Sequence, residues 1–93
     1  MNDTLMTPDM CMKFLIWSYY YNNISPTADF NFEECKLFTP EQAFELNNIK
    51  RAMLLCFTED SVVRAVEQLR MAKMKGEVCP FSKAELDAIF LKQ

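Results

Sequence analysis

Apolar residues recur at helical spacing in two successive series between residues 39 and 76. The first series follows steps of three and four, which place it on one helix face: Leu46, Ile49, Met53 and Cys56. The second series has the same character: Val62, Ala65, Val66, Leu69 and Ala72. Because only about four residues separate the two helices, we predict an antiparallel helical hairpin of residues 40–57 and 61–75. The rest of the chain is expected to pack on this hairpin.

The predicted hairpin has its own start and stop signals. Thr39 can cap the first helix, because a proline follows it and Gln42 completes a capping box. The second helix can begin at either of two hydroxyl caps, Thr58 or Ser61. Gly76 is the only glycine of the chain and follows the last apolar position, where a residue that adopts positive φ commonly ends a helix.

The N-terminal apolar stretch predicts a helix at about residues 8–21, which begins after a second Thr-Pro pair at Thr7. One face carries large side chains at steps of four, three and four: Met10, Phe14, Trp17 and Tyr21. Apolar residues cover most of the remaining surface, so this helix must be covered on nearly all sides. It is either the central core helix, or it leaves one edge, at Tyr19 and Tyr20, for a partner.

Residues 22–38 form a long connector without a clear period, and long connectors in small domains tend to be functional or to contain hidden structure. We expect a loop with a short helix. A short strand is the alternative, because Phe30 and Phe32 alternate with polar residues. Three carboxylates make the connector an acidic patch: Asp29, Glu33 and Glu34.

The C-terminal residues predict one more helix. Ser82 and Glu85 form a capping box, and apolar residues follow it at helical spacing up to about residue 92. A helix of residues 83–92 is short, so packing must stabilise it. The predicted fold is therefore all-α: a small single domain of residues 1–93 with four helices, or five if the connector contains one.

The chain lacks the residues that most catalytic and metal sites need. It has no histidine and therefore no Ser–His or Cys–His pair, and its single glycine excludes a glycine-rich phosphate loop. Its four cysteines are 24, 21 and 23 residues apart and form no CxxC pair: Cys11, Cys35, Cys56 and Cys79. We predict a non-enzymatic protein with no cofactor and no catalytic, cofactor-binding or metal-binding residues.

The same features bear on where the protein is expected to be. The N-terminus lacks the basic segment of a secretory signal, and the apolar run of residues 10–21 is too short to span a bilayer and contains Lys13. No membrane contact is expected. Cysteines without a disulfide pattern are typical of a reducing compartment, so we predict a cytoplasmic protein with free thiols.

Charge and apolar content together favour protein binding. The net charge is −3, with −5 in residues 1–45 and +2 in residues 46–93. The seven methionines and eight phenylalanines exceed what a core of this size needs. We therefore expect a small acidic module that acts as a stoichiometric inhibitor or adaptor on a larger intracellular partner with a basic surface. The residues expected to contact this partner are Trp17, Tyr19, Tyr20, Phe30, Glu33 and Glu34.

Small phage-type inhibitors of host nucleic-acid-binding complexes share this size and charge, which makes such a regulatory role one form of the hypothesis. Two alternatives come from other classes. Residues 39–75 can be drawn as a helix-turn-helix DNA-binding regulator, whose second helix presents four cations: Arg64, Arg70, Lys73 and Lys75. The net negative charge of the chain argues against DNA binding, because contacts with phosphates need positive charge. The third hypothesis is a structural homodimer that uses the helix at residues 8–21 as its own interface.

Overall fold

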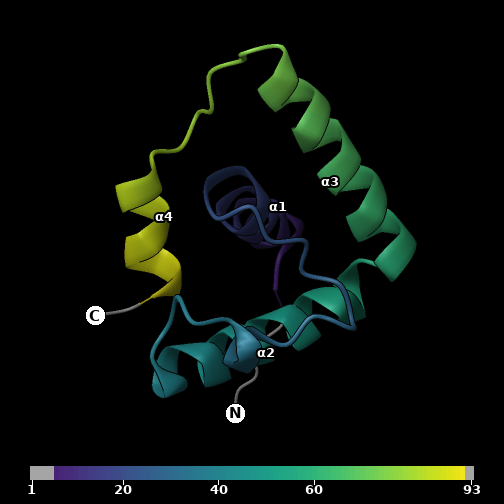
Figure 1. The fold of residues 1–93 in the computed structure, drawn as a ribbon. Helices are drawn as coiled ribbons and strands as arrows, with labels where there is room; N and C mark the ends of the chain where they lie inside the picture. Colours follow the sequence, from purple (N-terminus) through teal and green to yellow (C-terminus); the bar gives the residue numbers. More distant parts are fainter. Residues whose placement is uncertain (1–5, 92–93) are drawn as a thin grey trace.

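The computed structural model describes residues 6–91 of the chain. This part contains six helical segments and the loops between them (Figure 1). Four are α-helices: α1 (Pro8–Leu15), α2 (Pro40–Cys56), α3 (Glu59–Met74) and α4 (Lys83–Phe90). The others are a π-helical segment, η1 (Ile16–Tyr21), which continues α1, and a short 3₁₀ turn, η2 (Phe32–Glu34). The predicted all-α class is confirmed. None of these helices combines the length and the apolar character that crossing a bilayer requires.

Each α-helix begins at a hydroxyl cap. Thr39 and Gln42 form the predicted capping box, with N–H···O distances of 3.1 and 3.0 Å. Ser82 and Glu85 form the second one at the start of α4. The other two helices begin at threonine caps, Thr7 and Thr58. The caps of α1, α2 and α4 lie where the sequence predicted them. The helix predicted at residues 61–75 begins two residues earlier, because Thr58 rather than Ser61 is its cap. Residue 92, to which the predicted last helix extends, lies outside the described residues.

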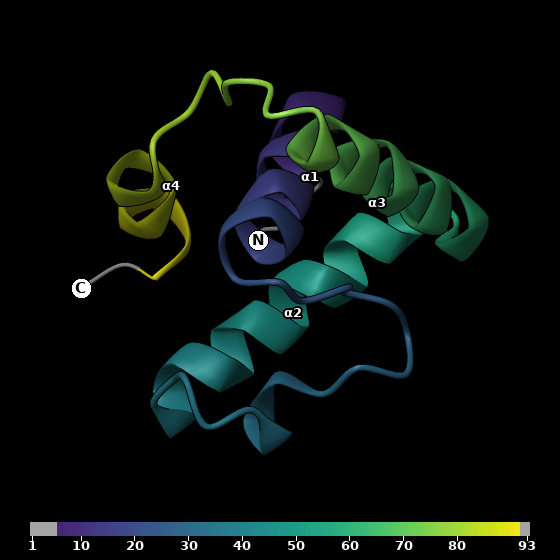
Figure 2. The same cartoon turned by 45° about the horizontal axis from the view of Figure 1, so that its top comes forward.

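The N-terminal helix is the centre of the fold. Figure 1 shows it end-on, with α2, α3 and α4 around it, and Figure 2 shows the same arrangement from another side. Four of its apolar side chains are fully buried: Cys11, Phe14, Leu15 and Trp17. The other helices therefore cover its apolar surface, as expected for a central core helix. Among the large apolar residues of α1, Met12 is the exposed one, so little of this helix is left for a homodimer interface.

The predicted antiparallel packing of the two long helices is not confirmed. The backbone is extended at Phe57, and from there α2 and α3 diverge, so that each packs on the α1–η1 helix rather than along the other (Figures 1 and 2). Leu46 and Met53 of α2 and Val62 of α3 are fully buried. An apolar stripe indicates that a helix face is buried, but not which element covers it. For each long helix, the aromatic side chains of α1 and η1 offer more apolar area to cover than the stripe of the other long helix does, so both helices pack on α1 and η1.

The central helix changes from α to π at Ile16. Ser18 stabilises the wider turn: its carbonyl oxygen accepts the Ile24 N–H at 2.9 Å, and its hydroxyl donates to the Ile24 carbonyl oxygen at 2.8 Å. Asn23 then adopts a φ of 60°, a left-handed conformation that asparagine tolerates. The predicted bounds of residues 8–21 hold. The change of period was not predicted, and it alters the directions in which the last aromatic side chains point.

Hydrogen bonds from η1 hold the C-terminal part of the chain. The indole N–H of Trp17 donates to Asp87 Oδ1 in α4 at 2.7 Å. Two tyrosine hydroxyls donate to backbone carbonyl oxygens of the segment between α3 and α4: Tyr20 to Glu77 and Tyr21 to Phe81. An eight-residue helix such as α4 is marginal alone, so these bonds and the burial of Leu86 and Phe90 stabilise it.

The Asp87 carboxylate accepts hydrogen bonds from two donors, the Trp17 indole and the Lys83 ammonium, the latter at 2.9 Å. Partial burial raises the pKa of Asp87, but the hydrogen bonds from Lys83 and Trp17 outweigh it and hold the pKa below its ordinary value of 3.8. The resulting stabilisation is fully present above that ordinary value. It is lost as the pH falls through the lower pKa of the folded state.

Replacing Trp17 tests this arrangement. Trp17→Phe removes the indole N–H and leaves a void beside Phe14 and Phe90, so we expect the free energy of unfolding to fall by about 2 kcal/mol. Urea denaturation measures it. Tyr19→Phe is the matched control, because the Tyr19 hydroxyl has no hydrogen bond within residues 6–91, and it should change stability by less than about 0.5 kcal/mol. Equal effects of the two substitutions would show that the buried Trp17 ring and its hydrogen bond to Asp87 do not stabilise the fold in particular.

Candidate interaction surface

The connector of residues 22–38 is held against α2 by buried polar side chains. The Asn47 side chain accepts the Phe32 N–H at 3.0 Å and donates to Asn31 Oδ1 at 2.9 Å. The Phe32 ring is fully buried, so the connector takes part in the core. The expected loop with a short helix is what the structure contains, with η2 as the helix and no strand in the connector.

Lys50 makes the second attachment, one helical turn beyond Asn47. Its ammonium donates to the carbonyl oxygens of Ala28 (3.2 Å) and Phe30, and only 6% of the residue is exposed. Burial lowers the pKa of Lys50, and the nearby Arg51 charge lowers it further. A buried charge is tolerated only when hydrogen bonds satisfy it, and these two carbonyls do so. The connector therefore has a fixed position relative to α2.

This attachment places the connector beside an exposed aromatic ring. Phe44 of α2 is 55% exposed, although it is one of the largest apolar side chains of the protein. It borders a hollow of about 400 Å³ that Glu33 of η2 lines from one side and Glu41 and Glu45 of α2 from the other. We call Glu33, Pro40, Glu41, Phe44 and Glu45 the Phe44 face.

A second hollow, of about 470 Å³, adjoins the Phe44 face on the side of the connector. Phe44 and Glu33 line both hollows, and the second one also reaches Asp29 and Phe30. The exposed ring is thus the centre of a larger surface that the connector and α2 build together. That surface has an apolar centre and a mainly acidic rim, which is the usual layout of a protein-binding patch with its polar residues outside.

The carboxylates of the Phe44 face form no ion pair in the described part of the chain. Within residues 6–91 the ion pairs are Lys13–Asp9, Arg70–Glu67 and Lys83–Asp87, and none of them involves this face. Two cations line the second hollow together with Asp29 and Glu33. The Lys50 ammonium donates to backbone carbonyls and the Arg51 guanidinium to Asn48, and neither forms an ion pair within residues 6–91. The three glutamates of the Phe44 face thus border an aromatic ring without forming an ion pair.

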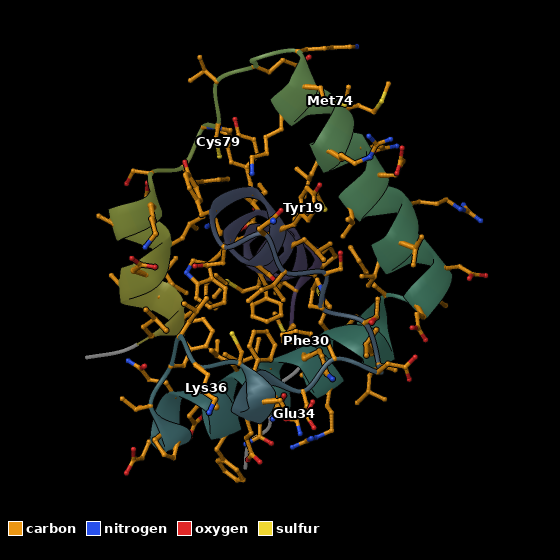
Figure 3. All side chains as sticks on the ribbon, in the orientation of Figure 1. Tyr19, Phe30, Glu34, Lys36, Met74 and Cys79 are labelled. Atoms are coloured by element: carbon orange, nitrogen blue, oxygen red, sulfur yellow. The ribbon has the colours of Figure 1, made fainter. Side chains whose placement is uncertain are left out.

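The six predicted partner-contact residues do not form one surface. Trp17 is fully buried and bonded to Asp87, so it belongs to the core and cannot touch a partner; this part of the prediction is corrected. Tyr19 and Tyr20 are half-buried, and the Lys73 ammonium lies 5.7 and 5.6 Å from the centres of their rings. In Figure 3 Tyr19 lies well away from the connector residues.

The connector residues among the six do lie together. Phe30 is half-buried with its ring 4.9 Å from that of Phe32, and it lines the second hollow. Glu33 belongs to the Phe44 face, and Glu34 is exposed beside it (Figure 3). Sequence reasoning missed Phe44, although a signal was present: an aromatic residue on the polar side of an amphipathic helix, with carboxylates in the adjoining positions.

The four cations of the DNA-binding alternative lie on α3 or at its end, and all are exposed. Two of them already have partners. The Arg70 guanidinium pairs with the Glu67 carboxylate, whose hydrogen bond raises the pKa of Arg70, and the Lys73 ammonium lies over the tyrosine rings. This leaves Arg64 and Lys75, which is fewer free cations than a phosphate-binding helix usually presents. DNA binding stays an untested prediction.

The cysteines do not gather at one place. Cys11, which is buried, and Cys56, which is exposed, are close enough for a hydrogen bond between their thiols. Burial first, and Cys56 second, raises the pKa of Cys11 to about 11. Cys79 lies beside the Tyr21 hydroxyl instead. In the part of the chain that the structure describes, no group of three or more cysteine, aspartate or glutamate side chains is placed to hold a metal ion.

Comparison of the chain with protein-family models, curated proteins and solved structures found no match. The function is therefore argued from the geometry above.

The attachment of the connector can be tested with two neighbouring asparagines. Asn47→Ala leaves the buried Phe32 N–H without an acceptor, so we expect the free energy of unfolding to fall by about 1–3 kcal/mol. Hydrogen exchange should be faster at the Phe32 amide. Asn48→Ala is the control, since in the described part of the chain the Asn48 side chain binds only the exposed Arg51 side chain. If Asn48→Ala lowers the free energy of unfolding as much as Asn47→Ala does, the attachment of the connector does not depend on Asn47.

The thiols give a second test. At about pH 8, a thiol with a pKa near 11 has about a hundredth of the thiolate of one with the ordinary value of 9.0, and the Cys11 thiol is also buried. We expect iodoacetamide to modify Cys56 in the folded protein, and Cys11 only after unfolding in urea. Mass spectrometry of the peptides locates the labels. Early labelling of Cys11 would show that α1 is not enclosed in solution.

Proposed function

We propose that this chain is a small non-enzymatic protein-binding module that acts as a stoichiometric inhibitor or adaptor on a larger partner, which it contacts through the Phe44 face. The observation that carries the proposal is Phe44 itself: a large ring, more than half exposed, on a helix and bordered by three glutamates that form no ion pair within residues 6–91. Aromatic side chains that are rigidly held supply much of the binding energy of protein interfaces.

The rigidity of the surface supports this use. Asn47 and Lys50 fix the connector, and Glu33 comes from its 3₁₀ turn, so both halves of the Phe44 face are positioned before any partner arrives. Side chains and loops that need no ordering on binding cost little conformational entropy. A preformed surface of this kind can bind without a change of backbone shape.

The charge of the surface indicates the chemistry of the partner. Glu33, Glu41 and Glu45 surround the ring, and Asp29 and Glu34 extend the negative charge along the connector. A partner with arginine or lysine residues around an apolar patch would complement it. Attraction between such surfaces mainly accelerates association, and salt weakens the effect.

Inhibition by occupancy is the form of action that we favour. A 93-residue chain with one preformed acidic and aromatic face can cover a basic surface on a larger protein and so keep a polyanion from it. A basic, nucleic-acid-binding surface on a host complex would be such a target, and a phage-type inhibitor would fit the size and charge of the chain. An adaptor would need a second face for a second partner.

Capture of the partner from a lysate of the source organism tests the proposal. We expect Phe44→Ala to reduce the captured partner about tenfold, because truncating a central aromatic contact removes a large part of the affinity. Reversing the charges at Glu33, Glu41 and Glu45 to lysine should slow association, with a smaller effect at high salt. Light scattering of the purified complex should give a one-to-one ratio.

Two matched variants control for general effects. Met74→Ala removes an exposed apolar side chain, 72% exposed, at the far end of α3, well away from Glu34 in Figure 3. Glu77→Lys reverses an exposed charge in the segment that follows α3. Neither should change capture. A partner that is retained by Phe44→Ala and by the charge-reversed chain, or that is lost equally with the controls, would remove the Phe44 face from the interaction.

A further inference from the structure

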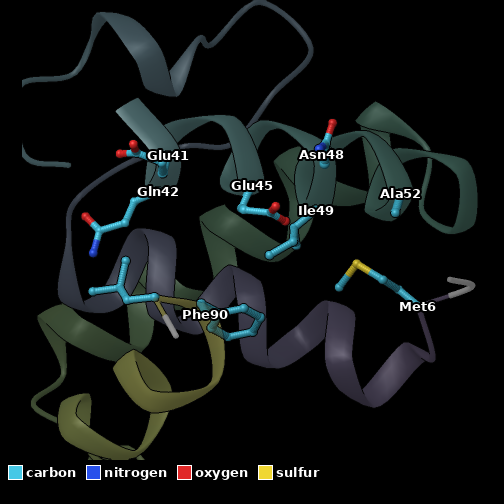
Figure 4. Close-up of a pocket in the computed structure, with 9 residues that line it drawn as sticks. Met6, Glu41, Gln42, Glu45, Asn48, Ile49, Ala52 and Phe90 are labelled. Atoms are coloured by element: carbon cyan, nitrogen blue, oxygen red, sulfur yellow. The ribbon is translucent and has the colours of Figure 1, made fainter. Parts of the chain in front are cut away.

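The carboxylate side of α2 also borders a groove. Both α2 and α4 pack on the central helix rather than on each other, and the space left between them is a groove of about 310 Å³. Figure 4 shows Ile49 of α2 and Phe90 of α4 on its two sides, with Met6 at one end. The groove thus exists because three segments of the chain meet without closing over one another.

The groove has an apolar floor and an acidic rim. Its apolar lining comes from Met6, Ile49, Phe90 and the residue after α4, Leu91, while Glu41 and Glu45 lie one turn apart along α2 (Figure 4). Its remaining lining residues are small or uncharged, and within residues 6–91 none of the lining side chains is basic. An occupant must therefore bring an apolar group inward and is favoured if it carries positive charge at the rim.

The size of the groove limits what can enter it. Pockets for cofactors and drug-sized ligands measure about 300–1,000 Å³, and this groove is at the lower end of that range and open on one side. That space suits one or two aliphatic side chains of a protein segment better than a whole cofactor. The surrounding carboxylates supply the charge complementarity that would hold such a segment in place.

We propose that this groove receives a leucine-sized side chain from a lysine- and arginine-rich segment of the partner. The proposal rests on the protein-binding function and specifies the chemistry that the partner presents. Glu41 and Glu45 belong both to the Phe44 face and to the groove, so one basic segment that crosses α2 can use the two sites together. The groove then makes binding specific for segments that carry an apolar side chain. The carboxylates alone would bind any basic segment.

The groove has its own spectroscopic reporter. Trp17 is the only tryptophan, and its ring lies 5.6 Å from that of Phe90, which lines the groove. A peptide without aromatic residues therefore adds no signal, and its entry next to Phe90 should change the tryptophan emission. Fluorescence anisotropy of the labelled peptide gives the affinity, and the emission change locates the binding.

Three peptides provide the test on the full chain: Lys-Arg-Leu-Leu-Lys-Arg, the same peptide with both leucines changed to serine, and the same peptide with every cation changed to glutamate. We expect the first to bind at least about tenfold more tightly than either of the others. Its affinity should fall as salt is added, and it alone should change the Trp17 emission. Equal binding of the leucine and serine peptides, or no binding of the leucine peptide, would overturn the proposal.

Variants of the chain locate the site. Ala52→Phe fills the groove and should weaken the leucine peptide about tenfold. Ala84→Phe, an equal enlargement at an exposed position of α4 outside the groove, should not. If Ala52→Phe unfolds the protein, Glu41→Gln combined with Glu45→Gln keeps the proposal testable, because these exposed changes should remove most of the salt dependence and weaken binding. Unchanged binding in that double variant would contradict the proposal.

Three further outcomes decide between the two proposals and the possible occupants of the groove. If Phe44→Ala abolishes capture of the native partner while Ala52→Phe does not affect it, the protein-binding function stands and the groove plays no part. If neither substitution affects capture, both proposals fail. If Leu5→Asp strengthens peptide binding about tenfold, the chain's own N-terminal residues compete for the groove, and the external segment is not its occupant.

Discussion

The ring of Trp17 must be enclosed, and the rest of the fold follows from that requirement. A chain of this length can hide a large aromatic cluster only by surrounding it with nearly all of its helices. Phe14, Phe38 and Phe90, from three different segments, approach the indole within 5.8 Å between ring centres. The one polar atom of the ring finds its acceptor in Asp87. Every helix is thus directed inward toward one segment, which is why α2 and α3 diverge.

That inward orientation decides what remains outside. Because α2 turns its Leu46 side to the centre, its opposite side is free to carry Phe44 and the glutamates. Polar residues at the boundary between the two sides, Asn47 and Lys50, attach the connector and complete the surface. A single helix therefore supplies core residues, the attachment of the connector and the exposed residues of the Phe44 face on three successive sides. The proposed function depends on this division of one helix more than on any separate domain.

The helix positions could be predicted because their causes are local. Caps such as Thr39 and Ser82 act within four residues, so the sequence alone reveals them. The packing of α2 against α3 could not, since an apolar stripe is equally consistent with any covering element. The π turn after Leu15 was missed for a related reason: it depends on Ser18 and Ile24 meeting, which is a matter of the folded chain. Glu33 lies at the surface, as expected for a charged residue. Trp17 was also expected at the surface but is buried, because its area alone does not reveal whether it faces in or out.

The two tyrosine hydroxyls of the π segment bind main-chain carbonyl oxygens, at Glu77 and Phe81, and not side chains. Every amino acid carries such an oxygen. These two hydrogen bonds therefore do not depend on which side chains stand at positions 77 and 81, provided that the length of the segment is kept and both tyrosines remain. Val78, whose side chain is 93% exposed, is the natural place to graft a tag or a dye while the core and the acidic surface stay as they are.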